Sequence, residues 1–140
     1  MATVIADEHQ TVLMYNVADA YRPATNVVAG LGLVAVCRFR LVLGAYLGAP
    51  NDEALENHPL YERGLGFYGV FRVEPSAWGE QLAIVALKKD RAMPPRQMTH
   101  VIVTMQDGTF ECVARDVSFE TRSGRVRDVA ADVLAGLAAV

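Results

Sequence analysis

An Asp-Gly pair at 107–108 constrains the fold of this chain more than any other feature of its sequence. The runs MTHVIVTMQ and TFECVARDV flank the pair, and Asp-Gly is preferred in two-residue type I′ turns between antiparallel strands. In the register that such a turn sets, one face is entirely apolar: Met105 pairs with Phe110, Val103 with Cys112, and Val101 with Ala114. The sequence therefore predicts a β-hairpin over residues 99–117 with this face toward the core.

The opposite face of the hairpin carries a mixture of polar and apolar side chains. Its expected pairs are Gln106 with Thr109, Thr104 with Glu111, Ile102 with Val113, and His100 with Arg115. A slip of one residue would mix the two faces, so their separation supports the hairpin.

Other strands and helices follow from hydrophobic periodicity. Residues 11–17 and 68–74 are β-prone, and 35–43 alternate in the manner of a half-buried strand: Ala35, Cys37, Phe39, Leu41 and Leu43 share one side, while Val36, Arg38, Arg40 and Val42 share the other. Ser76 is expected to cap a helix with a stripe of Trp78, Leu82, Val85 and Ala86. A last helix is predicted from the stripe Val126, Val129, Ala130, Val133, Leu134, Leu137 and Ala138.

The order of these elements predicts the fold class. Helices do not alternate with strands, which disfavours a parallel βαβ fold. We expect an α+β protein with an antiparallel sheet of about five strands and two helices packed on one face. Loops are expected at 19–25, where Pro23 interrupts the pattern, and around Pro94-Pro95.

Composition limits the class of protein and its partners. The chain has 140 residues, is 52% hydrophobic and carries a formal net charge of −3, which fits a single domain over residues 1–140. Acids are concentrated in GAPNDEALENHPLYERGLG, residues 48–66, where the only base is Arg63. Phosphate binding needs a basic face, so nucleic acid is not expected as a partner.

The sequence also bears on the compartment. The N-terminus does not resemble a secretory signal, and the most apolar stretch, 27–37, is too short to span a bilayer. We therefore expect a cytoplasmic protein without a membrane partner. Cys37 and Cys112 lie in apolar, strand-like runs, which predicts buried thiols, while one bridge between them remains the alternative.

The acidic loop 48–66 has a structural explanation. Asn51 can cap a short helical turn, DEALEN, that ends at His58-Pro59. Its apolar residues can attach the loop to the core: Leu55, Leu60, Tyr61 and Leu65. In this interpretation the acids face water and no ligand is needed.

The same loop also has a functional interpretation. His58 has a reference pKa near neutrality and could act as a general base when oriented by Asp52, Glu53 or Glu56. We take His58, Asp52 and Glu53 as candidate catalytic residues. The chain has no HExxH, CxxC, P-loop or GxSxG motif, and GLGFYG at 64–69 precedes a strand instead of a helix. Neither a metal nor a cofactor is therefore predicted.

A second candidate site is the mixed face of the hairpin. If Arg38 and Arg40 share a sheet face with it, a charged cluster would line a concave surface for a small anionic ligand or a partner's loop. The candidate ligand-binding residues are Asn51, Glu56, Arg38, Arg40, His100, Glu111 and Arg115. The alternative is a solvated sheet face with weak cross-strand ion pairs.

The segments GAPNDEALENHPL (48–60) and HVIVTMQDGTFECVA (100–114), together with Trp78, carry a family resemblance. The chain resembles a group of small bacterial proteins of uncharacterised function with a GAPNDE…HPL loop and a TFEC-containing strand. The resemblance implies a bacterial source and assigns no catalytic residue.

Three functions are compatible with these observations. The first is a non-enzymatic binding or interaction module that self-associates, with the acidic loop 48–66 at its working surface. That loop could meet the basic connection 88–96 across a dimer or within one chain. The second is a small hydrolase or isomerase that uses His58 with a loop carboxylate. The third is a small-molecule carrier with an apolar cavity.

Overall fold

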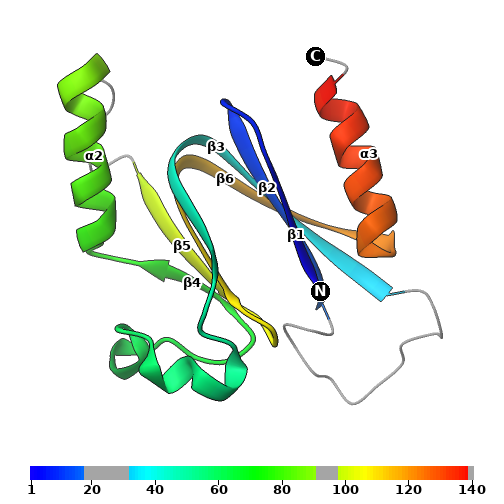
Figure 1. The fold of residues 1–140 in the computed structure, drawn as a ribbon, viewed down its shortest axis with the longest axis horizontal. Helices are drawn as coiled ribbons and strands as arrows, with labels where there is room; N and C mark the ends of the chain where they lie inside the picture. The colour runs from blue at the N-terminus through cyan, green and yellow to red at the C-terminus, as the bar shows by residue number, and fades with distance from the viewer. Residues whose placement is uncertain (18–31, 91–97, 139–140) are drawn as a thin grey trace.

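The computed structural model describes residues 1–17, 32–90 and 98–138, which form one antiparallel sheet with two α-helices (Figure 1). The strands are β1 (Ala2–Ala6), β2 (Gln10–Asn16), β3 (Gly32–Gly48), β4 (Val70–Val73), β5 (Thr99–Thr104) and β6 (Thr109–Gly124). The helices are η1 (Asp52–Asn57), η2 (Tyr61–Arg63), α2 (Ala77–Asp90) and α3 (Val126–Ala138). The expected loops at 19–25 and Pro94-Pro95 lie outside the described residues.

The predicted fold class is confirmed, with one strand more than expected. The six strands are ordered β1-β2-β3-β6-β5-β4, and every neighbouring pair is antiparallel. The extra strand is β1, which the sequence analysis did not predict. Among the described residues, no helix is both long and apolar enough to cross a membrane.

The long strands β3 and β6 bend the sheet over its own core. Phe39 pairs with Val117, whereas Phe110 pairs with Leu47, eight positions further along β3. A straight ladder would separate those positions by roughly 26 Å, yet the ring centroids of Phe39 and Phe110 are 5.4 Å apart. The sheet must therefore fold back on itself, and Figure 1 shows β3 and β6 curving together.

The bend coincides with an irregularity in β3. The register shifts between Val42 and Gly44, and Leu41 has a φ of 52°. The predicted alternation holds from Ala35 to Phe39, but Leu41 is exposed and Val42 packs against the core. The expectation that Leu41 shares a face with Cys37 is wrong, because the left-handed backbone at Leu41 interrupts the alternation just before the register shift.

The β5–β6 hairpin has the predicted faces in a different register. Val103 pairs with Phe110, and the connection is a four-residue loop, Met105–Gly108, in place of the two-residue turn. The Asp52 N–H donates to the Gln106 carbonyl at 3.1 Å, so a distant segment holds this loop. Because the register differs by two residues, the predicted apolar face is unchanged and all six of its residues are buried: Val101, Val103, Met105, Phe110, Cys112 and Ala114.

Both helices pack on the face of the sheet opposite this core, at its two ends (Figure 1). The α3 residues Val126, Val129 and Val133 are buried with Val12, Met14, Val34 and Val36. Over the other half lies α2, and a Cβ at Gly44 would stand 2.7 Å from Leu82 Cδ1. The predicted stripes are only partly correct, since Val85 and Leu134 are exposed.

The two cysteines are free and buried, as predicted. Burial raises the pKa of each thiol, Cys37 and Cys112, to about 12. Both side chains belong to the core inside the bent sheet.

Candidate functional site

The loop 48–66 folds over the outer face of the β5–β6 hairpin. The Asn51 side chain caps η1 as predicted, accepting from the Ala54 N–H at 3.1 Å. Leu55 and Leu65 are buried against Ile102 of β5. The mixed face of the hairpin is therefore covered by protein and is not a solvated sheet face.

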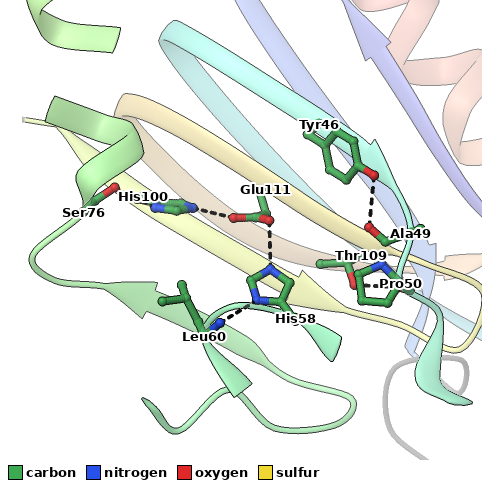
Figure 2. A network of polar contacts seen from close by, with 9 residues as sticks. All are labelled: Tyr46, Ala49, Pro50, His58, Leu60, Ser76, His100, Thr109 and Glu111. Atoms are coloured by element: carbon green, nitrogen blue, oxygen red, sulfur yellow. Dashed lines mark hydrogen bonds and ion pairs between the residues drawn. The ribbon is translucent and has the colours of Figure 1, made fainter. Parts of the chain in front are cut away.

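Two threonines on this face fix the loop by hydrogen bonds. Thr104 Oγ1 donates to the Gly66 carbonyl at 2.9 Å and accepts from the Gly69 N–H at 3.0 Å. Thr109 Oγ1 donates to the Pro50 carbonyl at 2.8 Å (Figure 2). Both ends of the loop are thus attached to the hairpin.

A pocket of about 1480 Å³ lies between this loop, the start of α2 and the outer face of the hairpin. Its walls are largely apolar, and the polar and charged residues of its lining are Tyr46, Asn51, Asn57, His58, Arg63, Ser76, His100, Asp107 and Glu111. The apolar part of the lining includes Ala54, Leu60, Val73 and Trp78.

Four of these side chains form a continuous hydrogen-bonded row, which we call the polar chain: Ser76, His100, Glu111 and His58 (Figure 2). Ser76 Oγ lies 2.7 Å from His100 Nδ1, and His100 Nε2 lies 2.8 Å from Glu111 Oε1. The other carboxylate oxygen, Oε2, lies 3.0 Å from His58 Nε2. The polar chain thus connects the start of α2 to the loop 48–66 by way of β5 and β6.

The backbone determines where the protons of His58 lie. The Leu60 N–H donates to His58 Nδ1 at 3.0 Å, so this nitrogen carries no proton. The ring proton is therefore on Nε2 and is donated to Glu111.

The same reasoning orients the other end of the polar chain. The Gly79 N–H donates to Ser76 Oγ at 2.8 Å, which leaves the hydroxyl proton to point at His100 Nδ1. His100 then donates its Nε2 proton to the Glu111 carboxylate.

The environment keeps Glu111 ionised. Burial alone would raise its pKa, but hydrogen bonds from His100 and His58 and the electrostatic attraction of both rings outweigh burial, and the pKa lies below its usual range. The Glu111 side chain is 18% exposed, against 4% for His100 and 6% for His58. The carboxylate is thus the member of this trio most accessible from the pocket.

The arrangement does not favour a metal. Over the described ranges 1–17, 32–90 and 98–138, no group of three or more His, Cys, Asp and Glu side chains is arranged to hold a metal ion. A histidine that binds a metal usually donates its other ring N–H to a neighbour, whereas His58 Nδ1 accepts from the Leu60 backbone.

The structure brings together three predicted site residues and separates the rest. His58, His100 and Glu111 meet in the pocket, so the carboxylate beside His58 is Glu111 and not a loop acid. Asp52 accepts a hydrogen bond from the Tyr68 hydroxyl, and Glu53 and Glu56 are exposed. Asn51 lines the pocket, although its side chain is the cap of η1.

The predicted arginine cluster does not form around this site. Arg38 pairs with Glu120 at 3.6 Å, and Arg40 and Arg115 are exposed. His100 pairs across the hairpin with Val113, not with Arg115, because the register differs by two residues.

Sequence reasoning missed Ser76 as a site residue and interpreted it only as a helix cap. It also placed Trp78 in the core, whereas its ring contacts His100 edge-on at 5.3 Å beside the pocket. No spacing in the sequence connects Ser76 with His100, which are joined only by the fold.

No protein-family model, curated protein or solved structure matches this chain.

Proposed function

We propose that the protein is a binding module whose small-molecule ligand occupies the pocket above Glu111. The proposal depends on one observation: a large pocket with apolar walls has an ionised carboxylate and its two histidine partners among its lining residues. Ligand sites typically combine apolar walls with a few convergent polar groups.

The lining indicates the chemical class of the ligand. Trp78, Tyr46, Leu60 and Val73 offer apolar and aromatic surface. Each Glu111 oxygen accepts one histidine N–H and retains a lone pair. We therefore expect an amphipathic molecule with an apolar body and a hydrogen-bond donor, such as a hydroxyl or ammonium group. The anionic ligand expected from the sequence was based on Arg38, Arg40 and Arg115, and none of these lines the pocket. Arg63 does line it, from an exposed position in the loop.

The single tryptophan provides a direct assay. Trp78 is the only tryptophan of the chain and lines the pocket, so its fluorescence reports occupancy. We expect titration with 2-phenylethanol and with 2-phenylethylammonium to change the emission saturably. Phenylacetate, which has the same ring and an anionic head group, should bind more weakly than both.

A matched pair of variants tests the location. Ala54→Leu places extra atoms in the pocket, whereas Ala45→Leu adds the same atoms at an exposed position of β3 outside its lining. Ala54→Leu should weaken the response to 2-phenylethanol and Ala45→Leu should leave it unchanged. Equal titrations in both variants, or tighter binding of phenylacetate, would contradict the proposal.

Self-association stays a prediction. It was based on the acidic loop 48–66 meeting the basic connection 88–96, and residues 91–96 of that connection lie outside the described residues. Light scattering over a range of salt concentrations would test it, with an electrostatic dimer dissociating as salt increases.

A further inference from the structure

We propose that this pocket also hydrolyses carboxylic esters, with Ser76 as the nucleophile, His100 as the general base and Glu111 as the group that orients the base. The inference goes beyond ligand binding but rests on it, because the ester must occupy the same pocket. The three side chains come from the start of α2, from β5 and from β6.

The distances fit nucleophilic catalysis by a serine. A nucleophile and its base must lie within hydrogen-bond reach, and the base must be oriented by a third group. Ser76 Oγ is 2.7 Å from His100 Nδ1, and His100 Nε2 is 2.8 Å from Glu111 Oε1. The row therefore has the order hydroxyl, imidazole, carboxylate.

The direction of the protons fits as well. A helix cap requires only that Ser76 Oγ accept the Gly79 N–H. That bond uses one lone pair and leaves the hydroxyl proton directed to His100 Nδ1, the nitrogen that must remove it. Nε2 of His100 donates to an ionised carboxylate, which stabilises the imidazolium that forms.

His58 has a positioning role. It donates to the second oxygen of Glu111 at 3.0 Å, and its own Nδ1 is fixed by the Leu60 N–H. Glu111 is therefore held from both sides, with one oxygen directed at His100. His58 acts through Glu111 and does not contact the reacting atoms.

The start of α2 supplies donors for the oxyanion. Ala77 and Trp78 lie in the first turn of this 14-residue helix, where backbone N–H groups have no acceptor within the helix. Both residues line the pocket next to Ser76. Backbone N–H groups at such a position stabilise the negative charge of a tetrahedral intermediate.

The reaction needs only the ester and water. Ser76 Oγ attacks the carbonyl carbon as its proton passes to His100 Nδ1; the bond from the acyl carbon to the alcohol oxygen breaks, and His100 returns the proton to that oxygen. Water then transfers a proton to His100 and attacks the acyl carbon. The bond between the acyl carbon and Ser76 Oγ breaks, His100 returns its proton to Ser76 Oγ, and the carboxylic acid leaves. The apolar walls favour uncharged esters with an apolar or aromatic group.

Two assays test the proposal: hydrolysis of p-nitrophenyl butyrate, and covalent labelling by a fluorophosphonate followed by peptide mass spectrometry. We expect a single label on Ser76 and saturable hydrolysis. Ser76→Asn retains a side chain that can cap the helix but has no hydroxyl, and should abolish labelling and lower the rate at least about 100-fold. Ser118→Ala, at an exposed serine of β6 outside the pocket lining, should label and hydrolyse like the wild type.

The positioning role has its own readout. His100→Gln should lose activity at every pH, whereas His58→Gln should retain turnover with an altered pH profile of kcat, because Glu111 then has one histidine donor fewer. An unchanged pH profile would show that His58 has a structural role only and does not position Glu111 for catalysis.

The outcomes separate this proposal from ligand binding. If 2-phenylethanol still changes the Trp78 fluorescence of the wild type, but the wild type is neither labelled nor active, the esterase proposal is overturned and the binding proposal stands. Label on another residue, or hydrolysis undiminished in Ser76→Asn, overturns the role of Ser76. If the wild type is inert in all assays, both proposals fail.

Discussion

The two faces of the β5–β6 hairpin differ in how they are stabilised. The inner face carries Phe110 and its apolar neighbours, which are buried inside the bent sheet. The outer face buries His100, Thr104 and Thr109 beneath the loop 48–66 and α2, and the side chain of each of the three is hydrogen-bonded. The stability of the inner face depends on close packing of apolar side chains. The stability of the outer face depends on hydrogen bonds to partners from distant segments.

The largest effect is expected on the inner face. Phe110 is fully buried and contacts Phe39 from the other half of the sheet. Phe110→Ala should lower the free energy of unfolding by about 3–5 kcal/mol, since it leaves a cavity where the sheet folds over itself. Urea denaturation measures this, with Phe119→Ala as the control because Phe119 is 54% exposed. Similar losses in both variants would mean that the inner face is not the main core.

A smaller loss of stability is expected from a substitution on the outer face. Glu111→Gln replaces one carboxylate oxygen with an NH₂ group, which cannot accept from a histidine N–H, so one buried donor loses its partner. We expect a loss of about 1–3 kcal/mol in the free energy of unfolding.

The control is Glu120→Gln, at a more exposed carboxylate that pairs with Arg38 and Arg122. Exposed ion pairs contribute little, so its effect should be within about 1 kcal/mol. A Glu111→Gln protein as stable as Glu120→Gln would show that the polar chain does not contribute to stability.

Acid should affect the two faces differently. The folded-state pKa of Glu111 is lowered, so its ionised form stabilises the protein above the unfolded-state pKa. This contribution decreases as the pH falls below about 4.5 toward the folded-state value. Urea unfolding at pH 7, 5, 4 and 3 should therefore show a smaller acid loss in Glu111→Gln than in the wild type. Phe110→Ala should retain the wild-type pH dependence. If the free energy of unfolding depends on pH equally in all three proteins, Glu111 is not a source of the acid sensitivity.

The contrast also explains what the sequence could predict. Apolar alternation identified the inner face and survived an error of two residues in register, because a shift of two preserves the side on which each side chain lies. It could not predict the bend in β3, where the left-handed backbone at Leu41 leaves Leu41 exposed and Val42 against the core.

The candidate site was predictable only in part. His58, His100 and Glu111 were each recognised as reactive or polar residues, but their meeting depends on the loop 48–66 closing over the hairpin. Ser76 has an ordinary local role as a helix cap, and nothing local in the sequence indicates its second partner, His100. Contacts between segments 24 to 53 residues apart, such as Ser76–His100 and His58–Glu111, follow from the tertiary fold and not from periodicity.

The smallest effect on stability is expected in η1, within the loop 48–66 that covers the outer face. Asn51 caps η1 through the Ala54 N–H, and Asn51→Ala should cost about 0.5–1 kcal/mol in stability. The helix it caps carries Leu55, which is buried against Ile102, and leads into His58. Loosening η1 should therefore increase hydrogen exchange at Leu55 and His58 more than at Val103 on the inner face.

Asn57→Ala, at an exposed asparagine of the same helix, is the matched control and should leave exchange unchanged. Equal increases on both faces would mean that the loop and the inner core unfold as one unit, and that the outer face has no separate stability.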